Sequence, residues 1–110
     1  MPKPAITPKE PSPSARIHAD VTDGRIVIHV EGRFDFNCHQ EFRRTYESAG
    51  AFSGYVVDLM GTEYVDSSAL GMLLVLREHA GAAPIQIANS RPAVRRILHI
   101  ANFHTLFTVS

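Results

Sequence analysis

Two stretches near the start of the chain are rich in β-branched residues and are predicted as neighbouring strands. The first runs over Ala15–Val21 and the second over Arg25–Val30, where Ile and Val recur among polar residues. Thr22, Asp23 and Gly24 separate them, and an Asp-Gly pair between two such runs is a strong hairpin signal. We therefore expect an antiparallel pair to open the folded domain.

The hydrophobic period lengthens after this pair. Cys38, Phe42 and Tyr46 recur every fourth residue, which is typical of the buried stripe of a helix. Asn37 and Gln40 have the spacing of a capping box. These positions predict a first helix that begins at Asn37 and ends near residue 48.

The next elements alternate between strand and helix. Tyr55–Leu59 is nearly continuous in apolar residues, as expected for a central strand covered on both faces. A second helix is predicted from Asp66, its N-cap, to Gly81. Pro84–Ala88 follows as a strand.

The last part of the chain is predicted to hold one more helix and a short strand. Ser90, Arg91 and Pro92 mark the start of the helix, because Pro suits a first helical turn. The core stripe of this helix, at positions i, i+3, i+4 and i+7, consists of Val94, Ile97, Leu98 and Ala101. The short strand follows at Leu106–Val109.

The order of elements is thus β-β-α-β-α-β-α-β, and it predicts an α/β fold. Right-handed crossovers give a mixed, largely parallel sheet that is opened by an antiparallel hairpin and packed with helices. A single domain over residues 15–110 accounts for all these elements. Residues 1–14 hold five of the seven prolines and almost nothing apolar, so we expect a disordered, Pro-rich tail.

Composition narrows the class of function. Eleven Lys and Arg balance 11 Asp and Glu, which argues against the electrostatic steering used by nucleic-acid and anionic-membrane binders. Cys38, the single cysteine, cannot form an internal disulfide or a thiolate metal site, which fits a reducing compartment. No apolar run approaches the roughly 18–20 residues that span a bilayer. We predict a cytoplasmic protein with no nucleic-acid or membrane partner.

Motifs for catalysis and cofactor binding are absent from the sequence. It contains no Gly-rich phosphate loop, no dinucleotide-binding glycine pattern and no Gly-x-Ser-x-Gly. The six histidines form no His-x-x-x-His pair, and the acidic residues show no accompanying ligand spacing. The sequence therefore predicts no metal, no cofactor and no catalytic residue. The histidines are His18, His29, His39, His79, His99 and His104.

A serine pair opens the second helix, at the kind of strand-to-helix junction where open α/β sheets bind ligands. Side-chain oxygens of Asp66, Ser67 and Ser68 can satisfy the free amides of the first turn, and capping alone would explain them. An exposed serine at a helix N-terminus is also accessible for phosphorylation, and the helix dipole favours the added charge. The two interpretations are compatible, because capping needs only Asp66.

The second helix is also apolar on both sides. At 100° per residue, Leu70, Leu73 and Leu74 share one face and are the predicted core stripe. The opposite face, which is mainly apolar, consists of Ser68, Met72, Val75, Leu76 and His79. An exposed apolar strip of this kind normally marks a protein interface, although self-association or cover by this chain's own residues would also explain it.

Together these residues resemble the STAS domain, and more narrowly the bacterial anti-sigma factor antagonists. The resemblance spans about residues 15–110 and is carried by Asp66–Gly71, which reads Asp-Ser-Ser-Ala-Leu-Gly after an apolar strand. Gly32–Asp35 matches a segment where the family often has Gly-Glu-Leu-Asp, and Arg91–Val94 matches the start of the third helix. Ala69 replaces the usual Gly, and the middle of Gly32–Asp35 also departs from the common pattern.

The resemblance implies partner switching. Unphosphorylated, such a domain binds an anti-sigma factor that is also a GHKL-type serine kinase, and so releases a sigma factor or another regulator. Phosphorylation breaks that complex, and a PP2C-type phosphatase restores it. By position, Ser67 is the phosphorylated serine, Asp35 matches the position near the kinase contact, and Asp66 matches the loop residue before the phosphoserine; both Asp residues are predicted to bind the partner. The remaining predicted partner-binding residues, taken from the apolar face, are Ser68, Met72, Val75 and Leu76.

Two alternatives stay open. STAS modules also occur as scaffold or adaptor subunits of larger complexes, stressosome-like or lipid-transporting, that do not act on a sigma factor. An enzyme would instead need Ser67 as a nucleophile and a base such as His29 or His104, and nothing at fixed spacing supports that arrangement.

Overall fold

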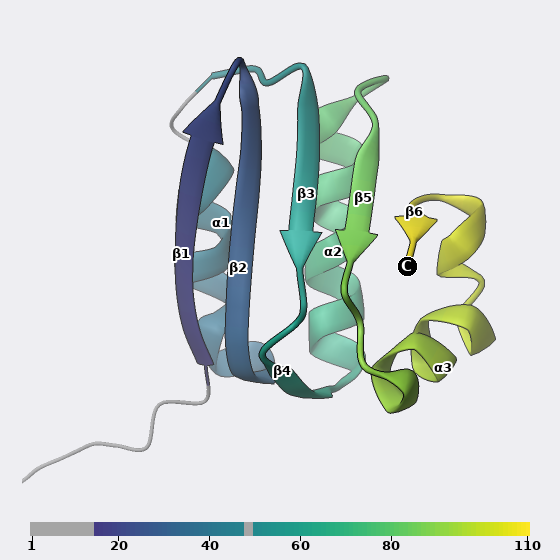
Figure 1. Cartoon of the computed structure of the whole chain (residues 1–110). Helices are drawn as coiled ribbons and strands as arrows, with labels where there is room; N and C mark the ends of the chain where they lie inside the picture. The colour runs from purple at the N-terminus through teal and green to yellow at the C-terminus, as the bar shows by residue number, and fades with distance from the viewer. Residues whose placement is uncertain (1–14, 48–49) are drawn as a thin grey trace, which may run out of the picture.

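The computed structural model describes residues 15–47 and 50–110, so the predicted tail over 1–14 lies outside the described residues. The chain forms a mixed six-stranded sheet with the order β1-β2-β3-β5-β6, and β4 pairs with one end of β2 (Figure 1). The strands are β1 (Ala15–Thr22), β2 (Arg25–Phe34), β3 (Gly54–Asp58), β4 (Thr62–Val65), β5 (Ile85–Ala88) and β6 (Thr108–Val109). The predicted α/β class is confirmed.

The predicted hairpin is also confirmed. β1 and β2 are antiparallel, and every other pairing between described strands is parallel. At the turn, Asp23 and Gly24 both have left-handed backbone angles, with φ of 53° and 79°. Such angles match the right-handed twist of the flanking strands.

Helices cover one face of the sheet. The helices are α1 (His39–Glu47), α2 (Ser67–Ala80) and α3 (Pro92–Ile100), with 3-10 turns η2 (Phe36–Cys38) and η3 (Phe103–Thr105). α1 and α2 lie side by side behind the strands, whereas α3 lies beyond β5 near the end of the chain (Figure 1). The other face of the sheet carries no helix from the described residues. None of the described helices is long and apolar enough to cross a membrane.

Alternation along the strands decides which side chains are buried. In β2, Ile26, Ile28 and Val30 are buried against the helices, whereas His29 between them faces the open side of the sheet. The stripe predicted for the first helix packs against these β2 side chains in the core, and its three residues are all buried. They are Cys38, Phe42 and Tyr46.

The predicted capping box at the first helix is wrong. The carboxylate of Asp35 accepts a hydrogen bond from the backbone amide of Asn37 at 3.0 Å, so Asp35 is the cap of η2. The chain therefore turns as soon as it leaves β2, and α1 continues from η2 at His39. Asn37 lies inside the turn instead of at its start.

The two faces of α2 are also corrected. Its buried stripe is Ala69, Leu73 and Leu76, at positions i, i+4 and i+7. Leu76 is 0% exposed and belongs to the core, whereas Leu74, predicted as core, is 43% exposed. Residues 72–76 are apolar without interruption, so the middle of the helix offers no polar residue to fix the orientation of the helical wheel.

The end of the chain follows the prediction in part. Val94 and Leu98 of α3 are buried as expected, but Ile97 and Ala101 are exposed. The last strand is shorter than predicted, because η3 and the residues after it occupy the preceding stretch. Two buried side chains, instead of four, attach α3 to the domain.

β4 is the element that the sequence pattern does not predict. Its side chain at Thr62 is buried and donates a hydrogen bond to the carbonyl oxygen of Val30 at 2.6 Å. In the parallel pairing of β4 with β2, Val65 is the register partner of Phe34. The two strands therefore end side by side, and η2 and α2, which follow them in the chain, start close to each other.

Candidate functional site

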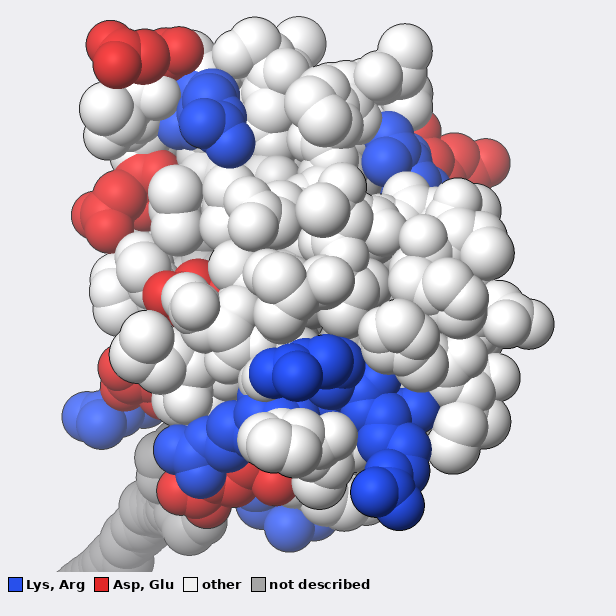
Figure 2. All heavy atoms as spheres, turned by 45° about the vertical axis from the view of Figure 1, so that its right-hand side comes forward, with Lys and Arg blue, Asp and Glu red and all other residues white. Residues whose placement is uncertain are grey.

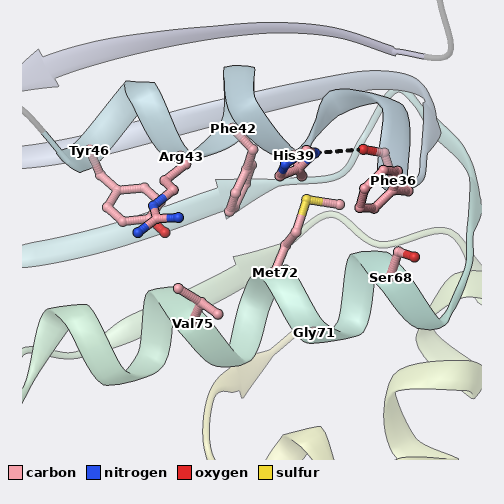
Figure 3. A pocket seen from close by; sticks show the side chains of 9 residues that line it. All are labelled: Phe36, His39, Phe42, Arg43, Tyr46, Ser68, Gly71, Met72 and Val75. Atoms are coloured by element: carbon pink, nitrogen blue, oxygen red, sulfur yellow. Dashed lines mark hydrogen bonds between the residues drawn. The ribbon is translucent and has the colours of Figure 1, made fainter.

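An apolar groove of about 320 Å³ lies between α1 and α2. Side chains from both helices point toward one another across it (Figure 3). The lining residues are Phe36, His39, Phe42, Arg43, Tyr46, Ser68, Gly71, Met72 and Val75. One wall thus comes from the η2–α1 segment, which the sequence analysis did not include in the site.

Phe36 forms the rim of the groove on the α1 side. It is 61% exposed, although aromatic side chains of this size are usually covered. Its ring stacks on His39 with 4.5 Å between centroids, and the His39 ring nitrogen Nδ1 donates to the Phe36 carbonyl oxygen at 3.0 Å. An exposed aromatic ring held in one orientation is well suited to contact a partner protein.

Asp35 directly precedes Phe36 and fixes the start of η2. It is only 8% exposed, caps η2, and lies 3.6 Å from Nε of Arg33. Its carbonyl oxygen also accepts from the Cys38 amide and thiol. Burial raises the pKa of the Cys38 thiol, which keeps it in its unreactive neutral form. The structure thus gives Asp35 a local role, and its contact with a partner stays a prediction.

The α2 wall contains three of the predicted contact residues, Ser68, Met72 and Val75. Met72 is half-buried and packs against the core as well as lining the groove, whereas Val75 is 48% exposed. Apart from the neighbouring residues of its own helix, no described residue comes within 4 Å of the position where a Cβ of Gly71 would stand, so the groove is open there. Leu76 is not part of this wall, because it belongs to the buried stripe of α2 and faces the core.

The serine pair stands at one end of the groove. The carboxylate of Asp66 accepts from the Ala69 amide at 3.0 Å, which confirms Asp66 as the N-cap of α2. Ser67 is exposed, and its hydroxyl makes no hydrogen bond within the described part of the chain. Ser68 is half-buried and lines the groove near Phe36 (Figure 3). Ser67 is therefore accessible, and it adjoins the groove through Ser68.

The balanced net charge hides an uneven distribution. No Asp or Glu follows Glu78 in the sequence, whereas Arg91, Arg95 and Arg96 are all exposed at the start and in the first turns of α3. Figure 2 shows basic side chains gathered toward the lower end of the molecule, whereas most acidic ones lie along the left-hand margin of the view. Positive charge therefore collects around α3, outside the α1–α2 groove.

The two histidines considered as bases for Ser67 are engaged elsewhere. His29 faces the open side of the sheet, and its two ring nitrogens lie 3.0 Å and 3.2 Å from carboxylate oxygens of Asp58 and Asp20. His104 stacks on His99 with 4.5 Å between centroids. Neither is hydrogen-bonded to Ser67 within the described residues.

Comparison with known proteins gives consistent results. A family model described as "Mlab, STAS domain" matches residues 17–108. A STAS-domain containing protein of Pseudomonas aeruginosa is 53% identical over 92 residues, which cover 80% of this chain and 91% of that protein.

Solved structures share the fold at low sequence identity. The anti-sigma factor antagonist SpoIIAA in its unphosphorylated form has a TM-score of 0.75 at 20% identity, covering 86% of this chain and 88% of that chain. An anti-sigma factor antagonist from Mycobacterium paratuberculosis has a TM-score of 0.70 at 23% identity, covering 87% and 85%. The phosphorylated form of SpoIIAA from Bacillus has a TM-score of 0.68 at 22% identity, covering 86% and 91%.

Proposed function

The chain belongs to the STAS-domain family, and from this membership and the α1–α2 groove we propose that it is an anti-sigma factor antagonist in a partner-switching pathway. Unphosphorylated, it binds an anti-sigma factor that is also a GHKL-type serine kinase. Phosphorylation of Ser67 releases that partner, and a PP2C-type phosphatase restores binding. The observation that carries the proposal is an apolar groove that ends beside an exposed serine.

The groove supplies the binding surface. Phe36, Met72 and Val75 offer apolar area on both walls, and an aromatic anchor beside a hollow is typical of the centre of a protein interface. Arg43 is the one Lys or Arg among the described lining residues, and its Nε lies 2.8 Å from a carboxylate oxygen of Glu47. The groove therefore presents little uncompensated charge, and a mainly apolar partner segment fits it.

The start of α2 supplies the acceptor. Because Asp66 caps the helix by itself, the Ser67 hydroxyl makes no hydrogen bond to the described residues that phosphorylation would disturb. The free amides and positive dipole end of α2 favour a negative group at this position. The free domain therefore tolerates the phosphate without refolding.

The same phosphate opposes the complex. It adds about −1.5 to −2 charges next to the Asp66 carboxylate, and a docked partner would remove water from both. Since each 1.4 kcal/mol is about a factor of ten in affinity, a loss of about 3 kcal/mol weakens binding roughly a hundredfold. The switch then acts on the bound state and leaves the domain intact.

A phosphorylation and binding experiment tests the proposal. The full chain and its Ser67→Ala and Ser68→Ala variants are incubated with ATP and the proposed partner, a purified GHKL-type anti-sigma factor kinase, and intact mass is followed. We expect one phosphate on the wild type and on Ser68→Ala, and none on Ser67→Ala. Phosphate on Ser67→Ala at the wild-type rate would show that Ser67 is not the acceptor.

The groove is tested with a matched pair on α2. Val75 lines the groove, whereas Leu74 is similarly exposed on the same helix but is not a lining residue. In calorimetric titration of the kinase, Val75→Lys should weaken binding at least about tenfold, because it places an unpaired ammonium in a dry contact. Leu74→Lys should bind like the wild type. Equal effects of the two variants would remove the groove from the proposal.

An adaptor role is the alternative, and the family model's description, "Mlab, STAS domain", is the observation that favours it. An adaptor subunit holds its partner regardless of the state of Ser67. The phosphorylated chain and Ser67→Asp would then bind the partner as tightly as the unmodified chain. A partner-switching antagonist predicts the opposite result for both.

A further inference from the structure

Four polar side chains form a row on the open face of the sheet, on the side away from the groove. His18 in β1 is directly opposite His29 in β2, and His29 is the register partner of Asp58 in β3. Asp20 follows His18 by two residues and so lies on the same face of β1. The pairing of three strands thus brings together residues that are far apart in the sequence.

The side chains of this row are in contact. Nε2 of His29 lies 3.2 Å from Oδ2 of Asp20, and Nδ1 of His29 lies 3.0 Å from Oδ2 of Asp58. The rings of His18 and His29 are stacked, with 4.6 Å between centroids. One possible ligand atom from each of His18, Asp20 and His29 lies within 4.8 Å of the other two.

We propose that His18, Asp20 and His29 bind a divalent transition-metal ion, with Zn²⁺ as the fitting example. Two imidazoles and one carboxylate are ligands that Zn²⁺ commonly uses. Bonds of about 2.0–2.1 Å in a tetrahedron place ligand atoms about 3.4 Å apart, and the His29 to Asp20 distance of 3.2 Å already meets this spacing. His18 and Asp20 are exposed, so their side chains are free to close on the ion.

Asp58 acts as the positioning residue for His29. Its carboxylate also accepts from the Met60 amide at 3.0 Å and from the Asn89 side chain at 3.1 Å. The Asp58 carboxylate therefore accepts a hydrogen bond from Nδ1–H of His29 at 3.0 Å and leaves Nε2 as the metal-binding nitrogen, an arrangement common around metal-bound histidines.

Three protein ligands leave one coordination position for water. A hollow of about 400 Å³ adjoins the row and is lined in part by His18, His29 and Asp58. The ion would also connect β1, the edge strand of the sheet, to β2 through their side chains. Metal binding should therefore stabilise this edge of the domain, independently of the groove on the other face.

Calorimetric titration of the untagged full chain with ZnCl₂ tests the site. We expect one Zn²⁺ per chain, and an affinity at least about tenfold lower for His18→Ala, since loss of even an outer partner of a metal site costs about 10–100-fold. The matched control is His99→Ala, because His99 and His104 also stack, with 4.5 Å between centroids, in a part of the chain that has no acidic residue. That variant should bind Zn²⁺ like the wild type.

A second measurement separates metal binding from folding. Circular dichroism melts with and without Zn²⁺ should show a metal-dependent rise in Tm for the wild type and none for His18→Ala, whose metal-free melt should match the wild type. Asp58→Asn should lower Zn²⁺ affinity about 10–100-fold if it orients His29. Absence of binding by the wild type, full affinity in His18→Ala, or an equal loss in His99→Ala would overturn the proposal. Equally tight binding of Mg²⁺ would overturn the transition-metal class.

Discussion

Truncation of Leu76 tests the orientation of α2, on which the whole description of the groove depends. Leu76 is 0% exposed, so Leu76→Ala removes buried carbon atoms and leaves a cavity. Such changes cost about 2–5 kcal/mol in the free energy of unfolding. In a domain of this size each kcal/mol shifts Tm by about 4–8 °C, so the melting temperature should fall by roughly 10 °C or more.

Val75, the next residue toward the N-terminus, is the matched comparison. It is 48% exposed and borders the groove, so Val75→Ala removes little buried area. Alanine is also the better helix former, which offsets part of any loss. We expect a change within about 0.5 kcal/mol, typical of a surface position.

Far-UV circular dichroism is the suitable probe, because the chain contains no Trp. Thermal and urea melts of the wild type, Leu76→Ala and Val75→Ala should place the first variant well below the other two. If Val75→Ala loses as much stability as Leu76→Ala, α2 is rotated relative to the orientation described above. The assignment of Met72 and Val75 to the groove would then be wrong.

Three further predictions concern single positions. Gly71→Ala should stabilise the fold by up to about 1 kcal/mol in urea melts, because Gly is a poor helix former and its surroundings are open, and the new methyl group should weaken binding of the kinase. Asp66→Ala should lower the free energy of unfolding by about 0.5–2 kcal/mol through loss of the N-cap, whereas Asp66→Asn should lose less. The pKa of Asp58 is lowered in the folded state, so its ionised carboxylate stabilises the fold. This contribution to the free energy of unfolding is fully present above the unfolded pKa of about 3.9 and is lost as the pH falls through the lower folded pKa. Acid titrations of stability should therefore show a shallower loss in Asp58→Asn, and an unchanged profile would contradict this role.

The opening hairpin and the buried stripe of the first helix were predictable because their patterns have one solution. In β2, Ile26, Ile28 and Val30 occupy every second position, and only one register buries them all. α2 offered no such constraint, because its apolar residues are continuous and the wheel fits more than one face. The sheet makes the choice through tertiary packing, and it selects Leu76 where the wheel alone favours Leu74.

The polar features that the sequence analysis missed depend on contacts between distant segments. β4 is short and half polar, and it exists because β2 extends far enough to pair with it. The row of His18, His29 and Asp58 is invisible to a search for ligand spacing along the chain, since each member comes from a different strand. A search over positions that face each other in the predicted hairpin would have found the first two.

The parallel pairing of Phe34 with Val65 has a consequence for how new specificities can arise. The two walls of the groove begin from strands that are hydrogen-bonded neighbours, so their separation at the serine end is fixed by backbone and not by side chains. Substitution of Phe36 or Met72 would therefore change the shape of the contact surface, while the distance from that surface to Ser67 stays the same. Duplicated copies of such a domain can acquire different partners and still answer to the same kind of modification.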